Sequence, residues 1–175
     1  THIHADHVSG LNELSKRTMC SKIMGEHSRS EVLDIRVKDN EKIKIENIEL
    51  ISIYTPGHTD CSYSFLMNDR VFTGDILLIN TTGRTDFQRG SSYDAYDSLF
   101  NRLLKLPEKT LVYPAHDYNE KKYSTIENEK NNNPRLQVGS KEEYAEIMNS
   151  LNLSNPIMLD IAVPANLKGL TLDKL

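Results

Sequence analysis

The sequence predicts an α/β domain built from layers of strands and helices. In its first half, stretches with alternating apolar residues follow one another across short turns, which is typical of strands that pair as hairpins or meanders. In its second half, apolar residues recur at helical spacing on either side of a short apolar stretch. Strands that first pair and then alternate with helices favour layers of sheet and helix. The length of 175 residues is that of one domain, so we expect a single domain over 1–175.

Strands are predicted where apolar residues alternate or form a short run between turn residues. Glu46-Asn47 and Asn68-Asp69 are turn residues of this kind, and each separates two such runs. We therefore expect antiparallel partners on either side of both turns. The predicted strands lie at 42–45, 48–54, 62–67, 70–73 and 111–113, and the mixed region 21–40 is expected to hold one short strand and a loop.

Helices are predicted from apolar spacing and from capping patterns. Apolar residues recur every three or four positions over 8–16 and over 94–106, and Pro107 ends the second of these stretches. Capping-box patterns begin at Ser124 and at Ser140, and each predicts the start of a further helix.

The charge balance argues against two classes of partner. Lys and Arg number 21 and Asp and Glu number 25, which gives a formal net charge of −4. Binding to nucleic acid would need clusters of basic residues, and a membrane span would need about 18 consecutive apolar residues. We therefore expect neither nucleic acid nor membrane as a partner. The two cysteines, Cys20 and Cys61, are too few for a disulfide scaffold.

The chain opens with a dense cluster of potential metal ligands, His2-Ile3-His4-Ala5-Asp6-His7. Alternate side chains of an extended segment point to one side, so we expect His2, His4 and Asp6 to converge, with His7 at the start of the helix that follows. A cluster of this kind at residue 2 also leads us to expect that a natural N-terminal portion is missing.

Three later residues each follow a predicted strand: His58 after Pro56-Gly57, Asp75 after Thr73-Gly74, and His116 after Pro114-Ala115. Loops at strand ends are where a rigid sheet positions functional groups. Together with the first cluster they predict a metal site, whereas His27 is expected on the surface.

The donor types leave two kinds of metal chemistry open. No C-x-x-C pair is present, which excludes a closed thiolate zinc site. Imidazole with carboxylate supports either a zinc ion that activates water or the two-His-one-carboxylate site of a non-haem Fe(II) oxygenase. Spacing alone does not choose between them.

These residues resemble the metallo-β-lactamase superfamily and, within it, the persulfide dioxygenase (sulfur dioxygenase, ethylmalonic encephalopathy protein) family. The resemblance implies an αββα four-layer sandwich, here expected to lack its N-terminal strands. The motifs that carry it are the His cluster at 2–7, Thr73-Gly74-Asp75, Gly83-Arg84-Thr85-Asp86-Phe87-Gln88, Tyr113-Pro114-Ala115-His116-Asp117-Tyr118, Asn133-Pro134-Arg135-Leu136 and Ala162-Val163-Pro164-Ala165-Asn166.

The resemblance also implies a reaction and roles for single residues. It implies one Fe(II) per chain and the oxidation of glutathione persulfide by O2 and water to sulfite and glutathione. His2, His58 and Asp75 would be the iron ligands, and Tyr118 and His116 would act in catalysis. Arg84, Tyr118 and Arg135 would bind the substrate, since the planar guanidinium matches glutathione carboxylates. His4, Asp6, His7 and His116 would orient the ligands, or hold a second metal as in dinuclear relatives.

Two other functions stay open from the sequence. A hydroxyacylglutathione hydrolase of the glyoxalase II type would use zinc or a mixed dinuclear site that includes Asp6, His7 and His116, with Asp75 as the bridge. A non-catalytic relative would keep the cluster only to bind metal. The resemblance also suggests the bacterial cytoplasm or the mitochondrial matrix as the compartment, and a homodimer as a possible assembly.

Overall fold

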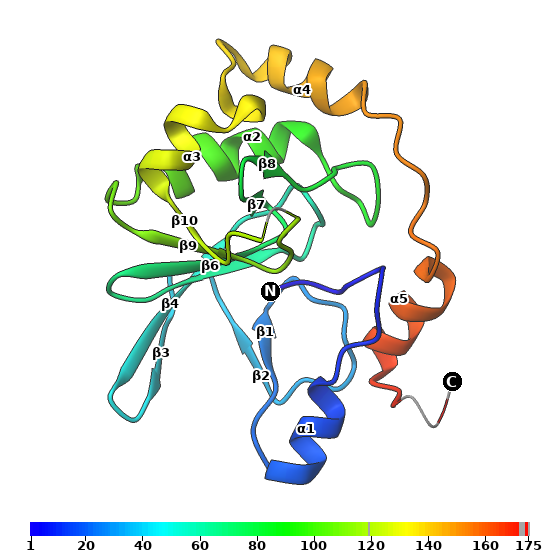
Figure 1. Cartoon of the computed structure of the whole chain (residues 1–175). Coiled ribbons are helices and arrows are strands. Elements are labelled where there is room, and N and C mark those ends of the chain that lie inside the picture. Colours follow the sequence, from blue (N-terminus) through cyan, green and yellow to red (C-terminus); the bar gives the residue numbers. More distant parts are fainter. Residues whose placement is uncertain (119, 172–173, 175) are drawn as a thin grey trace.

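A mixed sheet forms the centre of the computed structural model, which describes residues 1–118, 120–171 and 174. The strand order is β10-β9-β6-β5-β4-β3 (Figure 1). These strands are β3 (Lys42–Ile45), β4 (Ile48–Tyr54), β5 (Tyr63–Leu66), β6 (Arg70–Gly74), β9 (Leu111–Pro114) and β10 (Ser124–Thr125). Two smaller pairs are β1 (Ile23–Gly25) with β2 (Ile35–Val37) and β7 (Leu77–Leu78) with β8 (Thr81–Thr82).

The predicted turns and strand pairs are confirmed. β3 and β4 are antiparallel neighbours with Ile45 opposite Ile48, and β5 and β6 are antiparallel with Leu66 opposite Val71. β6 and β9, in contrast, run parallel, and the chain between them crosses over through a helix. The carboxyl ends of β6 and β9 therefore lie at the same edge of the sheet.

The helices cover the two sides of the strands. They are α1 (Leu11–Thr18), α2 (Ser92–Phe100), α3 (Ile126–Asn132), α4 (Lys141–Asn149) and α5 (Leu159–Lys168), with short 3-10 turns at Leu103–Lys105 and Pro134–Leu136. In Figure 1, α2, α3 and α4 lie above the large sheet, whereas β1–β2, α1 and α5 lie below it. The resulting order of helices, sheet, sheet and helices is the predicted four-layer arrangement.

Two predicted helices have different bounds in the structure, because side chains redirect the backbone at their ends. The helix predicted over 8–16 begins only at Leu11, since Ser9 N donates to Asn166 Oδ1 and Leu11 N donates to the hydroxyl of Ser9. The helix predicted over 94–106 begins at Ser92, capped by Ser91, and ends at Phe100. Beyond that end, Arg102 binds Tyr54 O and Asp39 instead of continuing the helix.

Two further predictions from the sequence are corrected, and one helix is added. Thr125, not Ser124, caps α3, because Ser124 is in β10 and its hydroxyl donates to Glu129. Region 21–40 holds two strands rather than one, and these pair parallel. Helix α5 was not predicted, because Pro164 lies inside it. Ser140 caps α4 as predicted, and His27 is exposed as predicted.

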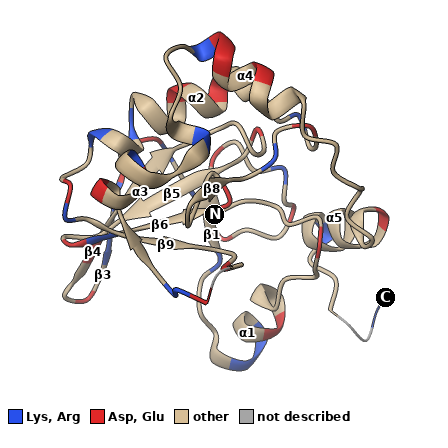
Figure 2. Cartoon of the chain, turned by 45° about the horizontal axis from the view of Figure 1, so that its top comes forward, with Lys and Arg blue, Asp and Glu red and all other residues tan. Residues whose placement is uncertain are grey.

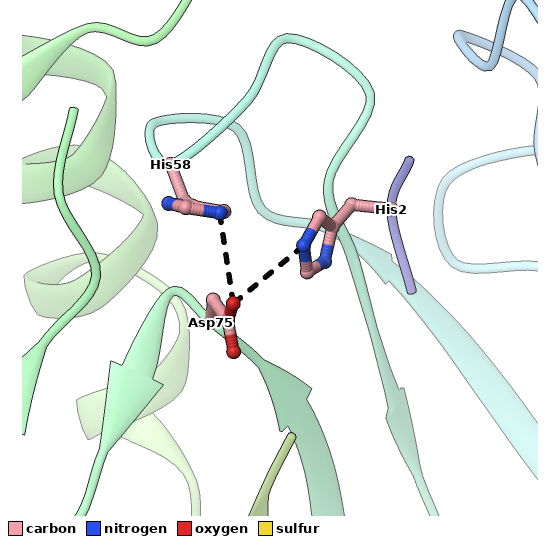
Figure 3. A group of neighbouring side chains, drawn as sticks. All are labelled: His2, His58 and Asp75. Atoms are coloured by element: carbon pink, nitrogen blue, oxygen red, sulfur yellow. Dashed lines mark ion pairs between the residues drawn. The ribbon is translucent and has the colours of Figure 1, made fainter. Parts of the chain in front are cut away.

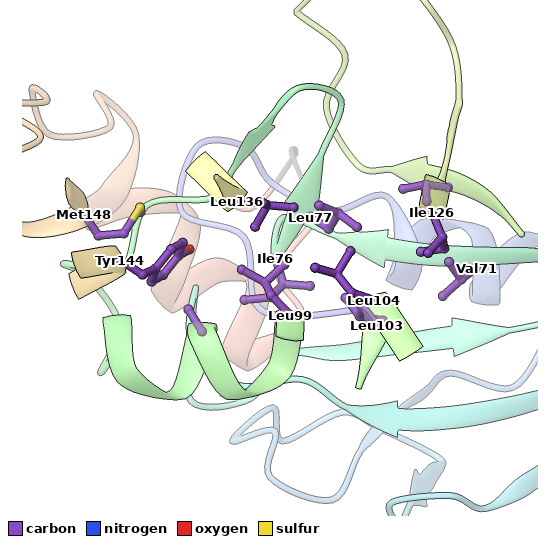
Figure 4. Close-up of a cluster of buried hydrophobic side chains, with 12 residues drawn as sticks. Val71, Ile76, Leu77, Leu99, Leu103, Leu104, Ile126, Leu136, Tyr144 and Met148 are labelled. Carbon is purple, nitrogen blue, oxygen red and sulfur yellow. The ribbon is translucent and has the colours of Figure 1, made fainter. Parts of the chain in front are cut away.

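The main core lies between the large sheet and the helices above it (Figure 4). Val71 of β6 and Val112 of β9 face Leu99 of α2 and Tyr144 of α4 within one buried cluster. Burial of these side chains holds α2 against the sheet, and with it the chain that links β6 to β9.

Replacing Leu99 by Ala should destabilise this core strongly. The Leu99 side chain is 0% exposed, so the substitution leaves a cavity and should lower the free energy of unfolding by about 2–5 kcal/mol. Leu14→Ala on α1 is the matched control, because Leu14 is 53% exposed and its loss should cost about 0.5 kcal/mol or less. Urea denaturation measures both, and equal losses would contradict the placement of the core.

Charges are mixed over the surface elements. Lys and Arg are interspersed with Asp and Glu along the ribbon (Figure 2), and α4 carries both signs. Within the described part of the chain, no helix has the length and apolar character needed to cross a membrane.

Candidate metal centre

Separate segments bring His2, His58 and Asp75 together at one edge of the large sheet. Asp75 directly follows β6, and His58 lies in the loop after β4. The N-terminal segment lies beside β5, where Tyr63 N donates to Thr1 O at 3.0 Å. Gly74 has φ +57°, and a Cβ there would lie 2.7 Å from Thr1 Oγ1, so only glycine admits this segment.

The three side chains face one another without hydrogen bonds between them (Figure 3). His2 Nε2 and His58 Nε2 each lie 3.7 Å from Asp75 Oδ2, and the three donor atoms lie within 4.8 Å of one another. Two donors that bind one ion at about 2.2 Å lie at most about 4.4 Å apart. The two separations of 3.7 Å therefore fit ligands around one metal ion better than hydrogen-bonded partners.

The surroundings of both imidazoles also fit metal binding. His58 Nδ1 donates to Arg84 O at 2.8 Å, which leaves Nε2 as the nitrogen with a free lone pair toward Asp75. Burial, together with the neighbouring His58, lowers the pKa of His2 well below its usual range. Two imidazole nitrogens and one carboxylate thus meet at one point, as in a two-His-one-carboxylate site.

His4 is adjacent to this group, and one of its buried ring nitrogens has no hydrogen-bond partner among the described residues. Its ring centroid is 4.2 Å from that of His2, and among the described residues its Nδ1 has no hydrogen-bond partner. Burial lowers the pKa of His4 to about 4, so the ring is neutral near pH 7. Buried polar atoms need a partner, and a metal ion or one of its water ligands would supply it.

His116 links the first group to a second one formed by His4, Asp6 and His7. His116 Nδ1 donates to Asp75 Oδ1 at 2.8 Å, and its Nε2 lies 2.9 Å from Asp6 Oδ2. The hydrogen bond with Asp75 raises the pKa of His116 to about 9, against the effect of partial burial. Asp6 Oδ1 in turn lies 2.9 Å from His7 Nδ1. Asp6 and His7 of the second group are thus already joined by a short hydrogen bond, unlike the members of the first group.

A cavity of about 430 Å³ opens beside the two groups, which is large enough for a small-molecule ligand. Every residue predicted to hold metal or substrate lies in this region. The cavity is lined by His2, Asp6, His58, Asp75, Arg84, His116, Tyr118 and Arg135, among others. His4 Nδ1 and His7 Nδ1 lie 4.0 Å and 2.9 Å from Asp6 Oδ1.

The three predicted substrate residues have different surroundings. The Arg84 guanidinium pairs with both oxygens of Asp86 at 2.7 Å and also donates to Ser154 O. Arg135 donates to Thr82 O but pairs with no carboxylate among the described residues. Tyr118 is 72% exposed at the edge of the cavity, with its ring parallel to that of His116. Arg135 is therefore the guanidinium with donors left for an anionic ligand.

Sequence reasoning missed two residues that hold the backbone of the N-terminal segment 1–9, which carries His2, His4, Asp6 and His7. Gln88 donates to Ile3 O at 2.7 Å, and Asn166 binds backbone atoms of His4, His7 and Ser9. Both residues belong to motifs that carried the resemblance, which is the one signal that marked them. Their partners lie 85 or more positions away in the sequence, so no local pattern could assign them a role.

Comparison with known proteins identifies the family to which this chain belongs. The model of the metallo-β-lactamase superfamily matches residues 1–116. A solved structure of ETHE1 from Myxococcus xanthus is 43% identical, with a TM-score of 0.92 over 95% of this chain and 73% of that one. The persulfide dioxygenase ETHE1 of Homo sapiens, named mitochondrial, is 41% identical over 96% of this chain and 66% of its own length. This chain thus spans just under two thirds of that relative.

A second kind of relative is more distant. A hydroxyacylglutathione hydrolase of Dictyostelium discoideum is 32% identical over 75% of this chain and 53% of its own length. The chain belongs to the metallo-β-lactamase superfamily and, within it, to the ETHE1 family, whose curated members are named persulfide dioxygenases.

Proposed function

We propose that this chain carries the iron centre of a persulfide dioxygenase, which oxidises glutathione persulfide with O2 and water to sulfite and glutathione. The observation that carries the proposal is the approach of His2 Nε2 and His58 Nε2 to the same Asp75 oxygen, at 3.7 Å each. Two imidazoles and one carboxylate on one side of an ion leave positions open for substrate, which is the ligand set of non-haem Fe(II) oxygenases.

His2, His58 and Asp75 would hold one Fe(II) ion. When bound, the iron would supply coordination of O2 and of the persulfide sulfur together with the electron transfer between them. The protein supplies geometry: Arg84 O fixes the ring of His58, and His116 fixes the unshared oxygen of Asp75. Outer contacts of this kind orient ligands and raise the affinity for metal.

The cavity residues would bind and orient glutathione persulfide. Arg135, which has no carboxylate partner among the described residues, would bind a glutathione carboxylate. Arg84 would act through its neighbours instead, because its donors already hold Asp86 and the backbone of residues 153 and 154. Tyr118, at the cavity edge, would donate its hydroxyl proton in a hydrogen bond to substrate.

A dinuclear hydrolase is the second candidate, because His4, Asp6 and His7 form another group with converging donor atoms. Against it, Asp6 already has hydrogen-bonded contacts with His7 and His116, and a second metal would have to break them. The relatives named hydroxyacylglutathione hydrolase are also less similar than those named persulfide dioxygenase. A non-catalytic metal-binding relative would show neither activity.

The reaction can be tested directly with two substrates. Fe(II)-loaded protein should consume one O2 per glutathione persulfide and release sulfite, whereas the thioester S-lactoylglutathione should remain intact. Oxygen-electrode and sulfite measurements check the first reaction, and loss of thioester absorbance checks the second. Thioester hydrolysis without O2 uptake would establish the hydrolase instead, and absence of both reactions would support the non-catalytic relative.

The compartment is proposed from the relatives. The mammalian ones are named mitochondrial, so we propose the mitochondrial matrix or, for a bacterial source, the cytoplasm. Fractionation of the source cells with an antibody to this protein checks it, and recovery in a secreted or membrane fraction would contradict it.

A further inference from the structure

The loop of residues 1–9, which carries His2, is held by a side chain from the other end of the sequence. Asn166 of α5 donates through Nδ2 to His4 O at 3.0 Å and to His7 O at 2.9 Å. Its Oδ1 accepts from Ser9 N at 2.7 Å. A carboxamide has two N–H donors and an acceptor oxygen, so Asn matches the two carbonyls and the one N–H that the loop presents.

A second amide fixes the backbone next to His2. Gln88 Nε2 donates to Ile3 O at 2.7 Å, and on the other side of His2 the N–H of Tyr63 donates to Thr1 O at 3.0 Å. The carbonyl groups before and after His2 are thus both held. These contacts fix the backbone path from which the imidazole of His2 reaches Asp75.

Helix α5 is itself held firmly enough to act as an anchor. Val163 and Leu167 pack against Ile3 and Cys61 in a small apolar cluster beneath the loop. The backbone of the helix end is fixed as well, since Glu31 N donates to Leu167 O at 2.8 Å. The side chain of Asn166 therefore projects from a packed element rather than from a free segment.

We propose that Asn166 and Gln88 are positioning residues of the metal centre, which hold the 1–9 loop in the path that lets His2 bind the same ion as His58 and Asp75. The inference rests on the metal centre proposed above. The side-chain hydrogen bonds of both amides go to backbone atoms and not to the side chains of His2, His58 or Asp75. Each acts through the backbone of the loop, so its loss should weaken metal binding and change the geometry of the ligands without removing a donor atom.

The main test is Asn166→Asp, which keeps the shape of the side chain. The carboxylate can still accept from Ser9 N, but it loses both donors and faces the carbonyls of His4 and His7. We expect the dissociation constant for Fe(II), measured by competition with a chelator, to rise about 10-fold or more. Loss of residues that hydrogen-bond to metal ligands in other proteins weakens metal binding by a similar factor. The visible spectrum of the Co(II)-loaded protein should change, because it reports ligand geometry. The KM of the iron-loaded fraction for glutathione persulfide should stay unchanged, since Asn166 does not line the cavity.

Two further variants keep the test decisive. Gln88→Glu makes the same change at the second amide and should also weaken metal binding. Asn128→Asp is the matched control, because Asn128 lies on α3 and its amide donates to Ser124 Oγ at 2.9 Å, away from the loop. It should lower the melting temperature while leaving metal affinity and the Co(II) spectrum unchanged.

Each outcome bears on the inference. Unchanged metal affinity and spectrum in both Asn166→Asp and Gln88→Glu would overturn it, even if the unsubstituted protein binds iron and the proposed reaction stands. Equal weakening in Asn128→Asp would overturn it as well, because general destabilisation would then explain the effect. If the unsubstituted protein binds no iron or cobalt, the proposed function and this inference both fall.

Discussion

Asp75→Asn should abolish iron binding and, with it, O2 uptake. Asp75 Oδ2 is the oxygen that both His2 Nε2 and His58 Nε2 approach at 3.7 Å, and Oδ1 accepts from His116. Asparagine keeps the shape but removes the negative charge and replaces one donor oxygen by an NH2 group. Loss of an outer partner alone weakens metal binding about 10- to 100-fold. Loss of a direct donor should therefore exceed about 100-fold in affinity, which metal analysis after dialysis would show as loss of iron.

The matched control for this variant is Asp69→Asn. Asp69 lies in the exposed turn between β5 and β6, and among the described residues its carboxylate pairs with its neighbour Arg70 alone. This variant should retain iron and full O2 uptake. Iron retention by Asp75→Asn at the level of Asp69→Asn would show that the metal does not bind at this carboxylate.

Arg135→Gln should raise the KM for glutathione persulfide about 10-fold or more with little change in kcat. A charge-assisted hydrogen bond is worth about 1.5–3 kcal/mol, and 1.4 kcal/mol corresponds to about a tenfold change in binding. Glutamine keeps an amide donor but not the charge that a glutathione carboxylate needs. Steady-state O2 uptake at varied persulfide concentration measures both parameters.

Arg84→Gln distinguishes the two cavity arginines. Arg84 is paired with Asp86 and with backbone carbonyls, so its loss should loosen residues 153 and 154 and raise the KM less than the loss of Arg135. Arg70→Gln, on the surface, should change neither parameter. A large KM effect at Arg84 combined with none at Arg135 would reverse the assignment of the substrate-binding residue.

The strands could be predicted from the sequence because their signals are local. The alternation over 42–54 places β3 and β4 on either side of a short turn, and this pair forms as expected. The pairing of β1 with β2 was missed, because each strand has only three residues and the two pair parallel across the nine residues 26–34, which leaves no local pattern.

Helix ends were less predictable, because tertiary contacts decide them. Arg102 breaks the predicted continuation of α2 by binding Tyr54 O and Asp39, both distant in the sequence. No helix was predicted over 159–168, where Pro164 interrupts the helical pattern, yet α5 forms there and its Val163 and Leu167 pack against Ile3 of the N-terminal loop. Packing of this kind outweighs local propensity and cannot be read from a short window.

The candidate site was predictable in its members but not in its connections. Donor types and strand ends indicated His2, His58, Asp75 and His116, and the structure brings them together. The hydrogen bond of His58 to Arg84 O and the pairing of Arg84 with Asp86 required the folded chain. Backbone carbonyls carry no sequence signal, so the contacts that orient the ligands were not visible.

The count of metal ions per chain in the active protein tests the central claim most directly. Elemental analysis of protein that consumes O2 with glutathione persulfide should find one iron per chain, held by His2, His58 and Asp75. Two metal ions per chain at full activity would contradict the account, because Asp6, His7 and His116 would then be ligands rather than the hydrogen-bonded partners that the structure shows.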